Sequence, residues 1–320
     1  MSSITSLLGK LPPSPKDKTG WPWTKESKPI PQVMPNGKPW PKISIVTPSY
    51  NQGLYLEETI RSVLLQNYPN LEYIVMDGGS TDNSVEIIKK YEPWLTYWVS
   101  EKDAGQADAI HRGFSRANGD VIGWLNSDDY LLSGALGKVG RSFAADLDLE
   151  FVVGGGIVVD DLGNLLRKYY SFPQNATSLL AIGQFFLQMS SFWSRETYQA
   201  VGGIDIFLRF CFDYDFFIRL AQRKTPGRLD SLLAAFRIHD RSKTSSIWES
   251  IAIPEFELIR RRHGFYSWPE LVREEMKTLY IRQYHLNNRK LKLKDIVLEP
   301  AYFLHTLKEK IWKNSRCAGV

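Results

Sequence analysis

The sequence is poor in cysteine and has no long apolar run. Its two cysteines, Cys211 and Cys317, lie far apart and outside the spacings of zinc sites or CxxC redox motifs. We therefore expect two reduced thiols and no disulfide scaffold. The apolar pair Leu7–Leu8 is soon followed by Lys10 and Pro12, unlike a signal peptide, and no window approaches the roughly 18 apolar residues of a membrane span. These absences predict a cytoplasmic protein without a membrane-spanning helix.

Two glycine-rich patterns are also missing. No GxGxxG opens a helix after the first predicted strand, and no GxxxxGK[ST] occurs in the chain. A dinucleotide cradle and a P-loop are thereby excluded. A phosphate-bearing ligand would instead need a bound metal ion to neutralise its charge.

Positive charge is scarce in the middle of the chain, although the formal net charge is +5. Residues 1–41 contain six Lys against two acidic residues, and residues 261–320 contain thirteen Lys or Arg against six acidic residues, which leaves −6 for residues 42–260. A nucleic-acid-binding domain carries its positive charge on the folded surface, so we expect no nucleic-acid partner. The apolar content of 43% indicates a globular protein.

The first 41 residues contain nine prolines, which prevent regular helix and sheet because each lacks an N–H group and has a fixed φ angle. Trp21, Trp23 and Trp40 are too apolar for a free tail. We therefore predict an extended N-terminal arm over residues 1–41, attached to the folded body by its tryptophans.

Beyond residue 41, short apolar runs alternate with amphipathic segments. Strands connected by helices form βαβ crossovers, which join parallel strands. The predicted fold class is therefore α/β, an open α/β/α sandwich around a mostly parallel sheet. The predicted strands span residues 43–47, 71–76, 95–99 and 121–125, and the predicted helices span residues 56–67, 83–91 and 107–117.

Polar loops follow all four predicted strands, at residues 48–53, 77–82, 100–106 and 126–129. Ligands of such sheets bind beyond the carboxyl ends of the strands, so four successive polar loops indicate a binding site. Tyr50 offers a flat face for a base, and Asp77 can accept a hydrogen bond from a base or a ribose. Asp128 and Asp129 are hard oxygen ligands of the kind that Mg²⁺ or Mn²⁺ prefers; alone, they would also suit a solvated turn.

The second half has shorter strands and more aromatic residues. We predict two short strands, 151–153 and 157–159, on either side of three glycines, and a strand over 165–170. Asp213 lies among phenylalanines at the start of a predicted helix, where it could act as a general base or cap the helix. His239 follows a predicted strand, and a lone histidine is usually structural.

The motifs TPSYNQG, DGGSTDNS, SEKDAGQADAIHRGF and GDVIGWLNSDD occur in this order. Together they resemble the inverting family-2 glycosyltransferases of GT-A fold, over about residues 43–239. The resemblance implies a metal-assisted single displacement from a nucleotide sugar, with a divalent Mg²⁺ or Mn²⁺ ion. The implied residues are Pro48, Tyr50, Asp77, Gln106 and Asp128 for the nucleotide sugar, Asp128, Asp129 and His239 for the metal, and Asp213 for the general base.

Three positions depart from the family pattern. Gly78 stands where many members have a second acidic residue, Asn126 stands where the family often has Asp, and Phe212 stands where it usually has Glu. Asp128 and Asp129 are then the only acidic candidates in their motif, and either of them could bind the metal.

Residues 251–320 are predicted to be mainly helical and combine basic with apolar and aromatic residues. Such segments contact anionic membrane surfaces, or they extend the core as solvated helices; both interpretations stay open. The predicted division is an arm (1–41), a GT-A domain (42–250, with a nucleotide-binding half to 130 and an acceptor half from 131) and a basic helical extension (251–320).

The predicted function is transfer of a sugar, with inversion, to a hydroxyl group of a glycan or a lipid-linked acceptor. UDP-sugar is the expected donor, with dTDP and GDP donors as alternatives, and the expected location is the cytoplasm or the inner face of the cell membrane. A non-catalytic module that binds nucleotide sugars or serves as a membrane-surface scaffold is the alternative. A nucleotidyltransferase is disfavoured because residues 48–53 lack a Gly-rich loop with Arg or Lys.

Overall fold

The computed structural model describes residues 6–240 and 248–298. The chain divides into two compact units, residues 1–268 and 269–320. Every strand among the described residues belongs to the first unit, and the described part of the second unit is helix α10 (Glu270–Leu298). The helices of the first unit are α1 (Leu56–Leu64), α2 (Ser84–Tyr91), α3 (Gln106–Phe114), α4 (Ala135–Ala145), α5 (Ala176–Ile182), α6 (Arg195–Ala200), α7 (Phe212–Arg223) and α9 (Ile253–Arg262).

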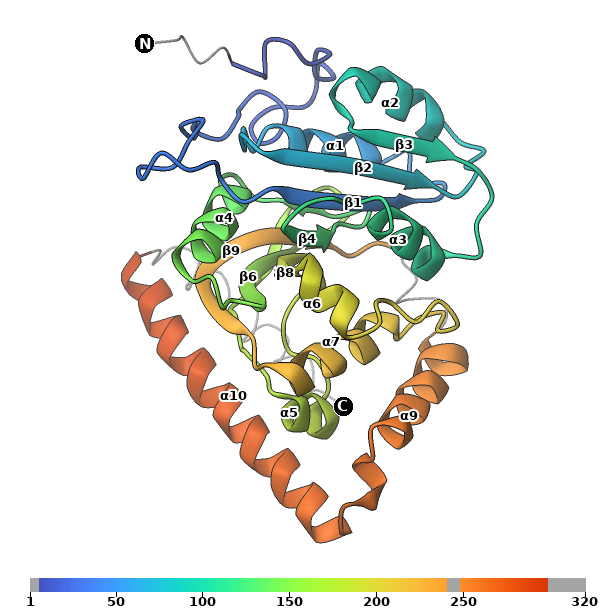
Figure 1. Cartoon of the computed structure of the whole chain (residues 1–320), viewed down its shortest axis with the longest axis vertical. Coiled ribbons are helices and arrows are strands. Elements are labelled where there is room, and N and C mark those ends of the chain that lie inside the picture. The colour runs from blue at the N-terminus through green and yellow to red at the C-terminus, as the bar shows by residue number, and fades with distance from the viewer. Residues whose placement is uncertain (1–5, 241–247, 299–320) are drawn as a thin grey trace, which may run out of the picture. The chain divides into compact units, whose positions relative to one another are not determined.

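A nine-stranded sheet runs through the first unit in the order β3-β2-β1-β4-β8-β6-β9-β5, and β7 pairs with β6 (Figure 1). Its strands are β1 (Ile43–Ser49), β2 (Leu71–Asp77), β3 (Tyr97–Ser100), β4 (Val121–Trp124), β5 (Tyr130–Leu131), β6 (Phe151–Val159), β7 (Leu165–Tyr169), β8 (Ser191–Ser194) and β9 (Gly227–Arg237). The GT-A-type sandwich predicted from the sequence is confirmed.

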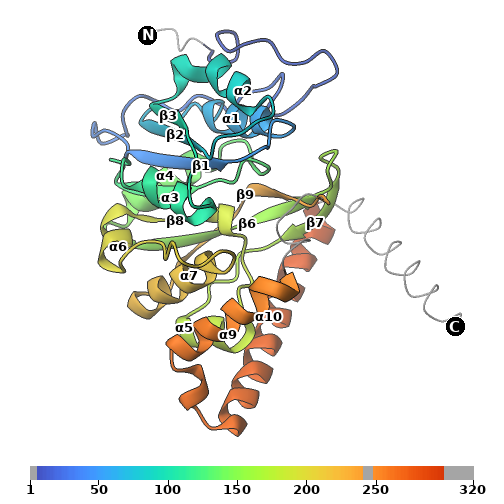
Figure 2. The ribbon, with the colours of Figure 1, turned by 90° about the vertical axis from the view of Figure 1, so that its right-hand side faces the viewer.

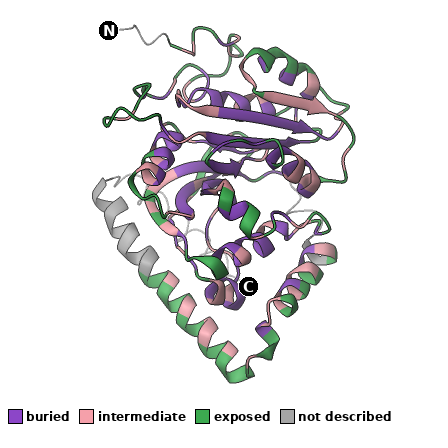
Figure 3. Cartoon of the chain, in the orientation of Figure 1, coloured by how far each residue is buried: buried purple, intermediate pink, exposed green. Residues whose placement is uncertain are grey.

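The first four strands are all parallel to one another. Helices α1 and α2 cover one face of this part of the sheet, and α3 covers the other (Figures 1 and 2). The change of face follows from the strand order, because the chain moves outward from β1 to β3 and then returns across β1 to β4. Strands β1 and β2 are buried almost along their whole length (Figure 3), as their uninterrupted apolar runs predict.

The second half of the sheet is mixed. Strand β6 pairs parallel with β9 but antiparallel with β7 and β8, and the β4–β8 and β5–β9 pairs are also antiparallel. Strand β7 follows β6 after a turn of five residues, too short for the crossover that a parallel pair needs. The mostly parallel arrangement therefore describes the half formed by residues 42–130.

The prediction of two short strands around Gly154–Gly156 is wrong, because β6 is continuous from Phe151 to Val159. The glycines allow β6 to lie unusually close to its neighbours. A Cβ atom at Gly154 would lie 2.3 Å from the Leu233 side chain, and one at Gly156 would lie 2.7 Å from the Ala234 carbonyl oxygen. Register shifts at these glycines let the strand stay paired with β9.

The N-terminal arm is bound to the first unit, as its tryptophans predict. Trp23 and Trp40 are buried, and the Trp21 indole donates a hydrogen bond to the Leu131 carbonyl oxygen (2.8 Å). The buried Arg61 guanidinium of α1 donates to three arm carbonyl groups, those of Pro12 (2.8 Å), Pro22 (3.1 Å) and Trp23 (2.8 Å). These contacts satisfy three carbonyl groups of the proline-rich segment, in addition to the hydrogen bonds that it forms within itself.

Across residues 6–240 and 248–298, no helix combines the length and the apolar content that a membrane crossing requires. Apolar side chains of α9 and α10 such as Leu258, Leu271 and Leu279 are exposed. Residues 299–320, part of the predicted basic extension, and the polar loop 242–246 after His239 lie outside the described residues.

Candidate active site

The ends of the parallel strands are aligned at one edge of the sheet. Ser49 of β1 pairs with Asp77 of β2, which in turn pairs with Ser100 of β3. The loops that follow are also linked, because the Asn51 N–H donates to the Ser80 hydroxyl (2.8 Å) and the Asn51 side chain accepts from the Thr81 N–H (2.8 Å). The predicted clustering of polar loops is therefore present.

Asp77 links the loops at this edge through hydrogen bonds to its side chain. Its buried carboxylate accepts hydrogen bonds from the Ser80 N–H (2.9 Å), the Ser80 hydroxyl (2.6 Å) and the Ser100 hydroxyl (2.7 Å). Pro48 is buried within β1, whereas the Tyr50 side chain is 61% exposed above the edge. Tyr50 is thus open to a ligand, while Asp77 holds the second and third loops together.

A chain of hydrogen bonds links the third loop to the fourth. Gln106, the first residue of α3, donates to the side-chain oxygen of Asn126 (2.9 Å), and Asn126 donates to the Asp129 carboxylate (3.2 Å). An Asp at position 126, as in many family members, could not donate to Asp129. The amide of Asn126 therefore suits a role in holding Asp129.

Asp128 and Asp129, adjacent in the sequence, have different environments. Asp129 is 1% exposed, and its second oxygen accepts from the Arg237 N–H (3.0 Å). Burial and the neighbouring charge of Asp128 raise the pKa of Asp129 well above its ordinary value. Asp128 is half-buried and has its Oδ2 atom 3.1 Å from His239 Nε2. Both carboxylate oxygens of Asp129 thus accept hydrogen bonds from the protein, whereas the Asp128 carboxylate lies next to the His239 imidazole.

Arg237 is a site residue that the sequence did not single out. Its buried guanidinium donates to the Asp128 carbonyl oxygen (3.0 Å) and pairs with Glu58 of α1 (2.7 Å). Burial raises the pKa of Glu58, although the positive charge of Arg237 acts in the opposite direction and lowers it. A charged residue two positions before His239, directly after the apolar run Leu232–Phe236, is the signal that could have identified it. Arg237 joins the nucleotide-binding half to the β9 end that carries His239.

Asp213 and Asp215 lie in the first turn of α7 but have different roles. The N-cap position is Cys211, so Asp213 does not cap the helix, and its carboxylate accepts from the Tyr214 N–H (2.8 Å). Asp215 is buried against Arg219 (2.8 Å) and His263 (3.0 Å). Burial alone would raise the pKa of Asp215, but the hydrogen bond from His263 and the charge of Arg219 lower it.

Helix α7 begins beside the end of β4. The rings of Phe212 and Trp124 lie 6.1 Å apart, and Trp124 precedes the Asn126–Asp129 loop. Gln188 donates to the Trp124 carbonyl oxygen (2.9 Å), which places a further polar side chain behind the same loop. The fold thus brings the start of α7 to the edge that carries Asp128.

The donor set at this edge fits a divalent cation. Asp128 would supply a carboxylate oxygen, the type of ligand that Mg²⁺ and Mn²⁺ prefer, and His239 would supply an imidazole nitrogen. In the described part of the chain, no group of three or more His, Cys, Asp or Glu side chains is arranged so that it could hold a metal ion. Two protein ligands are enough for an ion that also binds substrate phosphates.

Comparisons with known proteins show the family of the chain. The pattern of glycosyl transferase family 2 matches residues 44–204. A glycosyltransferase of Mycobacterium tuberculosis, itself uncharacterized, is 31% identical over 199 residues, which are 61% of this chain and 75% of that protein. The chondroitin synthase of Pasteurella multocida is 30% identical over 185 residues, which are 57% of this chain but 19% of that protein.

A solved structure shares the fold. Residues 1–349 of TarS from S. aureus, in complex with UDP-GlcNAc, match with a TM-score of 0.60 at 16% identity, covering 81% of this chain and 76% of that one. The family pattern spans half of the chain and includes all four strand-end loops. The chain therefore belongs to glycosyltransferase family 2 and is an enzyme that transfers a glycosyl group from a nucleotide sugar.

Proposed function

We propose that the enzyme moves the sugar with inversion, using Asp213 as the general base and a divalent metal ion bound by Asp128 and His239. The observation that carries the proposal is the convergence of Asp128 Oδ2 and His239 Nε2, 3.1 Å apart, at the strand edge where α7 begins. Asp213 is partly exposed in the first turn of α7, whereas Asp215 is buried in ion pairs with Arg219 and His263.

In this mechanism Tyr50 lies against the base of the donor, while Pro48, Asp77 and Gln106 shape the loops that receive the nucleotide. Asp128 and His239 would hold the metal ion, which when bound would supply positive charge to the leaving diphosphate. Asp213 removes the proton of the acceptor hydroxyl, which attacks the anomeric carbon from the face opposite the diphosphate. An α-linked donor then gives a β-linked product.

The comparisons support the proposed donor and acceptor classes. TarS binds UDP-GlcNAc according to its structure, so UDP-sugars are the first donors to test. Chondroitin synthase is a polysaccharide-forming relative, which supports a glycan acceptor in polysaccharide biosynthesis, with a lipid-linked sugar as the alternative.

The decisive experiment measures release of the nucleoside diphosphate from a panel of UDP-, dTDP- and GDP-sugars with Mn²⁺, with Mg²⁺ and with EDTA. Asp213→Asn should retain UDP binding but lose roughly 10²- to 10⁴-fold in turnover. Asp230→Asn, at an exposed position of β9, is the matched control. Turnover that survives EDTA would exclude the metal, and near-normal turnover of Asp213→Asn would exclude the base. A chain that binds UDP but turns over no donor would support the binding-module alternative.

We also propose that the basic extension brings the enzyme to the inner face of an anionic membrane. Helix α10 carries Lys277 and Arg282 together with exposed apolar side chains such as Leu279 and Ile281. Co-sedimentation with phosphatidylglycerol vesicles should be lost when the chain is cut after Trp268, the end of the first unit. Equal recovery of the intact and the shortened chain would exclude a membrane role for residues 269–320.

A further inference from the structure

The helix that carries Asp213 receives its N-terminal support from a distant part of the chain. Helix α7 has no side-chain cap of its own. Instead, the Glu255 carboxylate of α9 accepts hydrogen bonds from three consecutive backbone N–H groups, those of Arg209 (2.6 Å), Phe210 (2.9 Å) and Cys211 (2.8 Å). These groups belong to the loop that leads directly into α7, 44 to 46 positions before Glu255 in the sequence.

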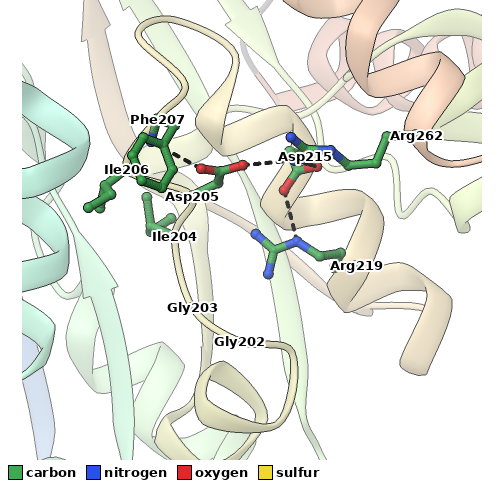
Figure 4. Close-up of a pocket in the computed structure, with 9 residues that line it drawn as sticks. All are labelled: Gly202, Gly203, Ile204, Asp205, Ile206, Phe207, Asp215, Arg219 and Arg262. Carbon is green, nitrogen blue, oxygen red and sulfur yellow. Dashed lines mark hydrogen bonds and ion pairs between the residues drawn. The ribbon is translucent and has the colours of Figure 1, made fainter.

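Helix α9 also holds the residues that follow Asp213. The Phe256 and Tyr214 rings are stacked with centroids 4.4 Å apart. Arg262 and His263, at the other end of α9, contact the Asp215 carboxylate at 3.2 and 3.0 Å. Figure 4 shows Asp215 between Arg219 and Arg262, with Arg262 also bonded to Asp205. Asp213 thus lies between residues 209–211, whose backbone N–H groups bind Glu255, and Tyr214 and Asp215, whose side chains contact α9.

Among these contacts, Glu255 determines the path of the chain into the helix. A charged acceptor of three backbone N–H groups is a strong and directional restraint, and the last of the three groups belongs to Cys211, the N-cap residue of α7. We propose that Glu255 is a positioning residue, which acts on transfer by holding the loop 209–211 so that Asp213 stays in reach of the acceptor hydroxyl. This inference rests on the proposed role of Asp213 as the general base.

The test compares Glu255→Gln with Glu257→Gln, a matched control that removes a charge from the same helix at a half-exposed position. Glutamine keeps the size of the side chain but presents an NH₂ group to one of the N–H donors. Glu255→Asp keeps the charge and withdraws the carboxylate by one methylene. Each variant is also made in the Asp213→Asn background. Three quantities are measured: the Kd for UDP, the melting temperature, and the kcat for the donor that the wild type uses. The kcat is normalised to the number of UDP-binding sites.

A displacement of about 1 Å at a reacting group can lower the rate about 100-fold, so we expect Glu255→Gln to lower kcat about 10- to 100-fold. The Kd for UDP should stay within about twofold, and Glu255→Asp should lie between wild type and Glu255→Gln. In the Asp213→Asn background, Glu255→Gln should have no further effect, because the residue through which it acts is already removed.

A contact that only stabilises the fold would lower the melting temperature but leave the normalised kcat unchanged, or lower kcat equally in both backgrounds. Either result would overturn the inference. A wild type that turns over no donor would overturn the proposed function itself. An active wild type whose Asp213→Asn variant is impaired while Glu255→Gln is unaffected would overturn the role of Glu255 alone.

Discussion

Arg237 offers the sharpest test of how the site is built. Arg237→Met keeps most of the side-chain length but removes the charge and four hydrogen bonds. These bonds reach the carbonyl oxygens of Asp128 (3.0 Å), Asp160 (3.3 Å) and Asp161 (3.0 Å) and the carboxylate of Glu58 (2.7 Å). Because hydrogen bonds within one network are not additive, the loss in free energy of unfolding is best estimated from the buried ion pair as a whole. Removing one partner of such a pair costs about 3–5 kcal/mol.

The assay is thermal unfolding with UDP binding measured in parallel. At about 2–4 °C per kcal/mol for a domain of this size, Arg237→Met should lower the melting temperature by about 6–20 °C. Arg228→Met is the control, because Arg228 lies on the same strand but forms a half-exposed pair with Asp230, and such pairs contribute about 0–1 kcal/mol.

The double variant Glu58→Gln/Arg237→Met should recover part of the loss, since it removes the unpaired buried carboxylate as well. If Arg237→Met unfolds within about 2 °C of Arg228→Met, Arg237 does not hold the site together and the reasoning fails. If the double variant is less stable than Arg237→Met alone, the penalty does not come from Glu58.

Two further predictions concern Asp129 and Tyr50. The raised pKa of Asp129 means that the folded state keeps the proton of Asp129 to a higher pH than the unfolded state does. The contribution of Asp129 to stability is therefore present at low pH, and it is lost as the pH rises from about 3.8 through the folded pKa. Asp129→Asn should therefore gain stability relative to wild type between pH 4 and pH 7 in urea unfolding, and a constant difference would contradict this. Tyr50→Ala should weaken UDP binding by about 1–3 kcal/mol, the range for aromatic stacking on a base, without changing the melting temperature. Calorimetric titration with UDP measures the change in affinity. Unchanged affinity would exclude stacking of Tyr50 on the base.

The sequence predicted the first half of the fold well because its signals are local. Apolar runs and polar strand ends depend on neighbouring residues, and the observed strands begin and end within about two residues of the predicted ones. Strand β6 was divided incorrectly because glycine disfavours a strand in isolation. Its three glycines are needed only when β9 and the side chain of Leu233 approach, which the local sequence does not reveal.

The site was predictable in its position but not in its internal roles. Asp128 and Asp129 are equivalent in a sequence, and they differ here because Arg237, 108 positions later, donates its N–H to Asp129. Glu58 is buried by a partner 179 positions away. Glu255 acts on backbone N–H groups, which every residue except proline carries, so no sequence pattern marks its target.

The attachment of the N-terminal arm has a consequence for synthesis. The arm leaves the ribosome before its partners Arg61 and Leu131, which follow up to 49 and 110 residues later. Until those partners have been made, the tryptophans of the arm have no surface to pack against. Its nine prolines deprive it of the N–H groups with which a waiting apolar segment would pair with strands of other chains. The same composition that prevents regular structure in the finished enzyme thus protects the nascent chain from aggregation until α1 and β5 have been made.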